Sequence, residues 1–183
     1  MNTVAYGGVE VPVLAREWCR TPHRLPYRKT YLLKPGERWL DAAPADTIWE
    51  HYVHLPGGAI PAGAMIVREL MAEGADTAVW TECYGRGRVV LMSPDLVCVD
   101  MTGDVGRILR QIHSANGNRW AGLPDAVGLF PNGRVVMRDA KVVGKDKISA
   151  TQHQFARAAR QVLGPRVEFA AVEWGRAAKS TEA

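Results

Sequence analysis

Two aspartates, Asp125 and Asp139, stand near the two ends of a segment patterned as a β-hairpin, and Lys141 follows two residues after the second. The turn signal is Asn132-Gly133, a pair whose residues tolerate the positive φ angles of tight turns. If the turn is centred on Asn132, Asp125 faces Asp139 across the hairpin. The two carboxylates then meet on one face of the sheet.

Facing residues of an antiparallel pair have Cβ atoms about 5 Å apart, so two like charges there repel each other. Strand alternation returns Lys141 to the face of Asp139, where its ammonium could neutralise one acid. Two acids converging beside a lysine also describe a site for a hard divalent cation, which prefers oxygen ligands. Two alternatives stay open: a plain ion pair of Lys141 with Asp139, and a turn centred one residue later, which would pair Asp125 with Ala140.

The elements that must position these residues follow from periodicity and from stop signals. The patterns predict a helix over 61–74, strands over 77–84 and 88–92, a helix over 104–113, and a hairpin with strands at 126–130 and 135–137. Ser149 and Gln152 form a capping-box pattern, Gly164-Pro165 ends the helix that follows, and 166–174 reads as a final strand. This order predicts an α/β core with a mixed sheet.

Residues 61–183 are therefore expected to form the core, and residues 1–60 an N-terminal extension of unknown role. In the extension, Asp46-Thr47 followed by IWEHYVHL predicts the start of a short helix. The basic stretch RTPHRLPYRKTY at 20–31 reads either as an arm that contacts phosphates or a partner subunit, or as a segment that wraps the domain.

The composition indicates one globular domain. The chain has 183 residues, of which 47% are apolar and 23% charged, and no apolar run reaches the length of a membrane span. The N-terminal segment lacks the pattern of a secretion signal, so a cytoplasmic location is expected. Three cysteines without a C-x-x-C pair predict buried thiols and neither a disulfide framework nor a zinc cluster.

Charge is distributed unevenly along the chain. Residues 1–100 carry a net charge of −2, whereas residues 101–183, which contain the two aspartates, carry +6. A positive surface around a metal site would suit a polyanionic substrate, although a solvated basic surface is the simpler alternative.

The segment from 117 to 174 resembles a known family. Several features follow one another here: GLPD at 122–125, the hairpin, Asp139-x-Lys141, the polar loop ending in KIS at 147–149, Gln152 and the closing strand. Together they resemble the PD-(D/E)XK nuclease superfamily. The resemblance is strongest to its VRR-NUC branch, found in stand-alone phage and bacterial proteins and at the end of a eukaryotic DNA-repair nuclease. It implies a restriction-endonuclease-like core of order αβββαβ, with a mixed central sheet flanked by helices.

The resemblance also implies roles for the site. Mg²⁺ would be bound by Asp125, Asp139 and the backbone carbonyl of Ala140, and Mn²⁺ could substitute for it. Lys141 would orient the attacking water or help to deprotonate it. Gln152 would support the site from the following helix. The sequence departs from the branch in having Asp139 where Glu is usual. A further acid upstream is expected, and the candidates are Glu69, Glu73, Glu82 and Asp104.

The activity that follows from the resemblance is a Mg²⁺-dependent DNA endonuclease that cleaves branched DNA such as Holliday junctions and works as a homodimer. The basic residues expected to meet DNA phosphates are Arg119, Lys145, Lys147, Arg157 and Arg160. Two alternatives remain: a restriction-type enzyme that reads a sequence, and a DNA-binding module without catalytic activity.

Overall fold

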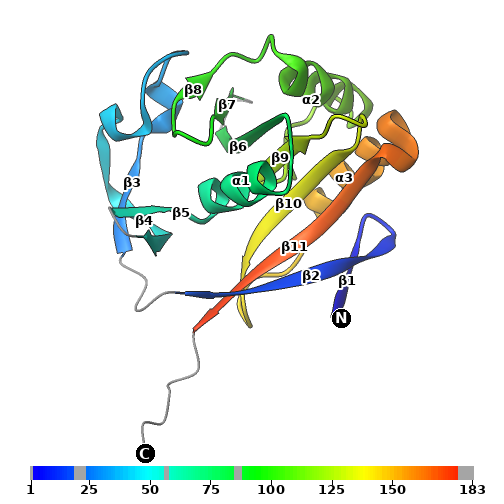
Figure 1. The fold of residues 1–183 in the computed structure, drawn as a ribbon, viewed down its shortest axis with the longest axis horizontal. Coiled ribbons are helices and arrows are strands. Elements are labelled where there is room, and N and C mark those ends of the chain that lie inside the picture. Colours follow the sequence, from blue (N-terminus) through cyan, green and yellow to red (C-terminus); the bar gives the residue numbers. More distant parts are fainter. Residues whose placement is uncertain (1, 19–23, 56–57, 85–87, 177–183) are drawn as a thin grey trace, which may run out of the picture.

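The computed structural model describes residues 2–18, 24–55, 58–84 and 88–176 (Figure 1). Cys19 and residues 20–23 of the predicted basic arm lie outside this part of the chain. Within it no helix has the length and apolar character needed to cross a bilayer. Of the cysteines it contains, Cys98 is buried as predicted, whereas Cys83 is exposed.

The main sheet is mixed, which confirms the predicted α/β class at this level. Among the described residues eight strands form it in the order β1 (Thr3–Tyr6), β2 (Val9–Trp18), β11 (Val167–Arg176), β10 (Val135–Val142), β9 (Ala126–Leu129), β6 (Thr77–Tyr84), β7 (Arg88–Met92) and β8 (Cys98–Val99). Strand β11 runs parallel to both of its neighbours, β10 and β2, and the other pairs are antiparallel. The first two strands thus belong to the same sheet as the strands of residues 61–183.

A second, three-stranded sheet contains β3 (Arg24–Arg28), β4 (Pro44–Leu55) and β5 (Gly58–Pro61). The helix predicted after Asp46-Thr47 is wrong, because this segment is strand β4. Its apolar residues 48, 52 and 55 have helical spacing, yet the segment is rich in β-branched and aromatic residues, and pairing with β3 and β5 on both sides decides its conformation. Short 3₁₀ helices occupy Thr30–Leu32, Trp39–Asp41 and Gly164–Arg166.

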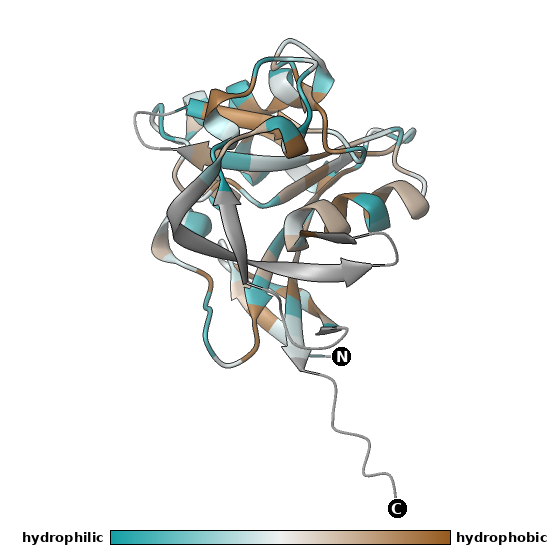
Figure 2. Ribbon diagram, turned by 90° about the vertical axis from the view of Figure 1, so that its left-hand side faces the viewer, coloured by the Kyte–Doolittle hydropathy of each residue, from teal (hydrophilic) through white to brown (hydrophobic). Residues whose placement is uncertain are grey.

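Three α-helices are described: α1 (Ala62–Ala72), α2 (Asp104–Ala115) and α3 (Ala150–Leu163), and all three confirm the predicted positions. They cover opposite faces of the sheet. Residues of α1 pack in one buried cluster with Trp80, Ala126 and Val136, whereas residues of α2 and α3 pack in another with Val127 and Met137. Figure 2 shows that the strands and helices each carry both hydrophobic and hydrophilic residues.

The hairpin of β9 and β10 has the predicted register. Val135 pairs with Leu129 and Arg138 with Ala126, which centres the turn on Asn132, and Gly133 has a φ of +77°. The next pair in this register joins positions 125 and 139. Strand β10 carries buried charged residues along its second half, and these define the candidate site.

Candidate active site

Asp125 and Asp139 lie on the same face of the sheet, the face that α3 covers. Asp125 directly precedes β9 and is fixed on both sides: its Oδ2 accepts a hydrogen bond of 2.7 Å from the backbone N–H of Ala140, and its carbonyl accepts one of 2.9 Å from the N–H of Thr81. The Thr81 hydroxyl donates to the carbonyl of the neighbouring Pro124. The first aspartate is therefore held between β6 and β10.

Asp139 is almost completely buried, with 1% of its surface exposed, and its carboxylate is surrounded by polar groups. Gln152 Nε2 donates to Oδ1 at 2.7 Å, the Tyr6 hydroxyl donates to Oδ2, and Lys141 Nζ lies 3.9 Å from Oδ1. Burial raises the pKa of Asp139, while the charge of Lys141 and the hydrogen bonds from Tyr6 and Gln152 oppose that rise. The predicted convergence of both aspartates with Lys141 and Gln152 is thus present in the structure.

Helix α3 begins where Gln152 can reach the site. The Ser149 hydroxyl accepts a hydrogen bond from the Gln152 N–H at 3.2 Å, and the Ser149 N–H donates to Gln152 Oε1 at 2.9 Å, so the predicted capping box is confirmed. Gly122 packs against this first turn with a φ of +87°, and a Cβ there would lie 2.1 Å from the carbonyl oxygen of Thr151. Only glycine fits this close approach, which places the segment before Asp125 against the start of the helix.

Lys141 connects the carboxylates to a cavity of about 320 Å³. Strand β1 supplies Val4 and Ala5 to its lining, and the loop before α3 supplies Lys147. His153 and Glu173 complete its polar lining together with Asp146. A substrate group in this cavity would contact Lys141, which lies 3.9 Å from Asp139, although neither aspartate is part of the cavity lining.

The two candidate acids on α1 lie on the opposite face of the sheet. Arg138 alternates with Asp139 along β10, and its guanidinium donates to both oxygens of Glu73 at 2.8 and 2.6 Å. Glu69 binds Arg16 through two hydrogen bonds of 2.8 and 2.9 Å. Both glutamates therefore neutralise arginines, and the structure does not bring them to the aspartate pair.

The other two candidates for the upstream acid also lie elsewhere. Glu82 accepts a hydrogen bond of 3.2 Å from the Thr30 hydroxyl, and its position on β6 alternates with Thr81, away from the aspartate face. Asp104 is exposed at the start of α2, pairs with Arg107, and lines a hollow beside the hairpin turn, at the other end of β9 and β10. Within the described residues no cluster of three or more acid, histidine or cysteine side chains could hold a metal ion.

The predicted phosphate-binding residues fall into two groups. One group is exposed: Arg119 in the loop after α2, Lys145 and Lys147 in the loop before α3, and Arg157 on α3. Arg160 differs, because its Nη1 donates to the carbonyls of Tyr6 and Gly7 at 2.8 and 3.0 Å and its guanidinium packs over the Phe169 ring at 4.9 Å. The charge of Arg160 thus serves the contact between α3 and β1.

Tyr6 is the site residue that the sequence reasoning missed. It donates to a carboxylate 133 residues away, and no local pattern reports a contact at that separation. The one available signal was Gly7-Gly8, a dipeptide typical of turns, which places Tyr6 at the end of a strand.

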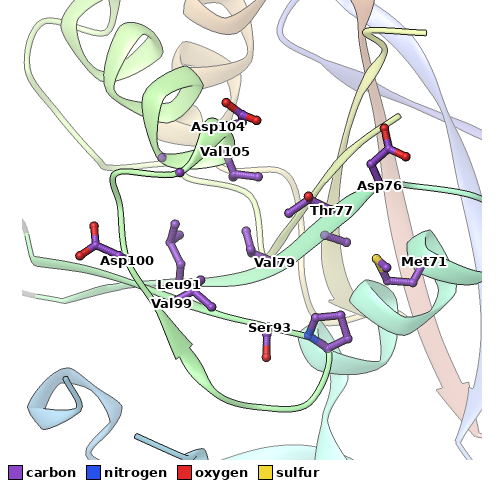
Figure 3. Close-up of a pocket in the computed structure, with 14 residues that line it drawn as sticks. Met71, Asp76, Thr77, Val79, Leu91, Ser93, Val99, Asp100, Asp104 and Val105 are labelled. Carbon is purple, nitrogen blue, oxygen red and sulfur yellow. The ribbon is translucent and has the colours of Figure 1, made fainter. Parts of the chain in front are cut away.

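A second cavity, of about 260 Å³, lies between the end of α1, strands β6 and β7 and the start of α2 (Figure 3). Its floor is apolar, with Val79 and Leu91, and Asp76, Asp100 and Asp104 stand around it. Its lining contains no lysine, arginine or histidine, so the aspartates would repel a phosphate group. The cavity beside Lys141 is the better approach for an anionic substrate.

Comparison of the chain with protein-family models, with curated proteins and with solved structures finds no match. Its function is therefore inferred from its own residues and their geometry.

Proposed function

We propose that this protein is a Mg²⁺-dependent DNA endonuclease. The observation that carries the proposal is the position of Asp125 opposite Asp139, one residue beyond the last pair of β9 and β10. Its Oδ2 accepts a hydrogen bond from the N–H of Ala140, Lys141 Nζ lies 3.9 Å from Asp139, and Gln152 donates to Asp139 at 2.7 Å. Phosphodiester hydrolysis needs an activated water and a counter-charge for the developing negative charge on phosphorus, and this group of residues can supply both with a bound cation.

The donor set fits Mg²⁺. Asp125, Asp139 and the Ala140 carbonyl are hard oxygen ligands, and magnesium is commonly held by one or two carboxylates with water and substrate phosphate completing its shell. A third acid is therefore not required. Bound there, Mg²⁺ would polarise the phosphate and lower the pKa of a coordinated water.

The remaining residues act on the carboxylates and on the substrate. Lys141 lies between Asp139 and the cavity, where its ammonium can pair with a phosphate oxygen or orient the attacking water. Gln152 holds one Asp139 oxygen in place from the first turn of α3. Lys147 lines the same cavity, and the exposed Lys145 and Arg157 belong to the adjoining loop and helix α3; these side chains can bind the DNA backbone without reading sequence.

The order of elements also supports a restriction-endonuclease-like core. Helix α1, strands β6, β9 and β10, helix α3 and strand β11 follow one another in the αβββαβ order, with β7, β8 and α2 inserted after β6. Strand β11 returns parallel to β10 through α3, and β6, β9 and β10 are antiparallel neighbours.

The proposed substrate is branched DNA, cleaved by a homodimer whose two sites cut opposed strands. The preference for a junction comes from the family resemblance, and basic residues that contact phosphates without reading sequence are compatible with it. Cleavage of a synthetic four-way junction but not of a linear duplex supports the junction substrate. Cleavage of linear DNA at fixed sequences would instead indicate a restriction-type enzyme.

The direct test is nicking of supercoiled plasmid with Mg²⁺ or with EDTA. We expect wild-type protein to nick only with Mg²⁺, and Asp125→Asn and Lys141→Ala to lose at least a hundredfold in rate. Asp95→Asn and Lys34→Ala are matched controls, because both residues are exposed and Asp95, like Asp125, follows a proline. No Mg²⁺-dependent nicking by the wild type would refute the proposal.

A DNA-binding module without catalysis is the second candidate, because Asp139 is 1% exposed and both of its oxygens already accept hydrogen bonds. This candidate predicts DNA binding that persists in Lys141→Ala, together with no nicking by the wild type.

A further inference from the structure

The N-terminal hairpin brings a tyrosine to the candidate site. Strands β1 and β2 are joined by Gly7-Gly8, and Tyr6 is the last residue of β1. Its side chain is fully buried, and its ring packs against Phe169 with a centroid distance of 4.9 Å. Burial of a hydroxyl is unfavourable without a partner, so the direction of this hydroxyl is informative.

The Tyr6 hydroxyl donates to Asp139 Oδ2, while Gln152 donates to Oδ1 of the same carboxylate. Two donors from segments far apart in the chain therefore fix the rotation of this buried side chain. A tyrosine hydroxyl is protonated at neutral pH, so it acts as the donor in this contact.

The turn after Tyr6 is fixed to α3. The Gly7 N–H donates to His153 Nδ1 at 2.9 Å, and Arg160 Nη1 donates to the carbonyls of Tyr6 and Gly7. Gly7 has a φ of +64°, and a Cβ there would lie 2.5 Å from Arg160 Nη1 and 2.7 Å from the Ala156 Cβ. The turn can therefore neither shift nor accept a side chain without moving Tyr6.

We propose that Tyr6 is a positioning residue that orients Asp139 for metal binding. The inference rests on the proposed metal-dependent function of this site. A carboxylate offers about four lone-pair positions. Tyr6, Gln152 and the backbone of Asp125 occupy three of those of Asp139, and the remaining one would face a cation shared with the Asp125 side chain. Hydrogen-bond partners of metal ligands keep them in the binding geometry, and losing one costs about 10–100-fold in metal affinity.

The test is Tyr6→Phe, which removes the hydroxyl and keeps the ring against Phe169. Mn²⁺ binding is measured by electron paramagnetic resonance and calorimetry, independently of activity, and the Mg²⁺ concentration for half-maximal nicking is measured beside it. We expect both values to weaken about tenfold or more in Tyr6→Phe. Tyr31→Phe is the matched control and should leave both unchanged, because Tyr31 lies in the 3₁₀ helix at 30–32.

A second variant separates positioning from folding. Gly7→Ala keeps the hydroxyl but displaces the turn, so it should weaken Mn²⁺ binding in the same direction while circular dichroism verifies the fold of both variants. Unchanged Mn²⁺ affinity in a folded Tyr6→Phe protein would overturn the inference. Tighter Mn²⁺ binding by this variant would also overturn it, because the Tyr6 hydroxyl would then occupy the place of the ion. If the wild type binds Mn²⁺ through Asp125 and Tyr6→Phe weakens it without any cleavage, the inference holds and only the nuclease proposal fails.

Discussion

Replacing Gln152 by alanine removes two hydrogen bonds at the start of α3, and the loss in stability can be worked out from them. The bond from Nε2 to the buried Asp139 carboxylate, 2.7 Å long, has a charged acceptor, and such bonds contribute about 1.5–3 kcal/mol. The bond from the Ser149 N–H to Oε1, 2.9 Å long, is half of a capping box and contributes about 0.5–1 kcal/mol. The free energy of unfolding should fall by about 2–4 kcal/mol.

Chemical denaturation and thermal melting, both without divalent cations, measure this loss. For a chain of this size about 1 kcal/mol corresponds to about 2–4 °C, so Gln152→Ala should melt about 4–16 °C lower than the wild type. Gln154→Ala is the matched control, since Gln154 is exposed on the same helix and its loss should change stability by less than about 0.5 kcal/mol.

Ser149→Ala separates the cap from the carboxylate contact. It removes the bond from the Gln152 N–H to the hydroxyl and leaves the contact with Asp139, so it should cost only about 1 kcal/mol. If Gln152→Ala melts within about 1 °C of Gln154→Ala, the bond to Asp139 does not stabilise the protein and the reasoning is refuted.

Three further predictions test the placement of the site. Gly122→Ala should lower the free energy of unfolding by more than about 2 kcal/mol, because the added Cβ would meet the backbone of α3. Gly117 also has a positive φ, but a Cβ there would have nothing within 4 Å, so Gly117→Ala should cost about 1 kcal/mol. Equal losses of the two variants in chemical denaturation would contradict the close packing of Gly122 against α3. Glu69→Gln and Glu73→Gln should leave the Mg²⁺ concentration for half-maximal nicking unchanged, because both acids lie on the face opposite Asp139; a rise in either variant would return that acid to the metal site. Arg157→Ala should weaken DNA binding equally for all sequences and reduce the slope of log affinity against log salt by about 1 in fluorescence titrations, and an unchanged slope would place the DNA elsewhere.

The hairpin and its register could be predicted because their causes are local. Asn132-Gly133 fixes the turn, and side-chain alternation then decides which residues face each other. The same holds for the capping box of Ser149 and Gln152. The placement of Asp125, Asp139 and Lys141 on one face follows from these local rules, whereas the contact of Gln152 with the site was implied only by the family resemblance.

The sequence predictions that were wrong or incomplete concern residues whose structure or role depends on contacts with distant parts of the chain. Strand β4 carries apolar residues at helical spacing, and only its pairing with β3 and β5 decides against a helix. Helix α1 was predicted correctly, but the roles of Glu69 and Glu73 depend on Arg16 and Arg138, which approach them from distant strands. Tyr6 could not be assigned to the site for the same reason.

The pairing of β2 with β11 has a consequence for synthesis of the chain on the ribosome. Among the described strands, β2 pairs with β1 and with β11, and an isolated two-stranded hairpin is marginally stable in water. Strands β1 and β2 are synthesised before β11 and must therefore wait for residues 167–176 before they can join the sheet. Translation adds about 5–20 residues per second, so Tyr6 remains without its carboxylate partner for several seconds or more after it leaves the exit tunnel.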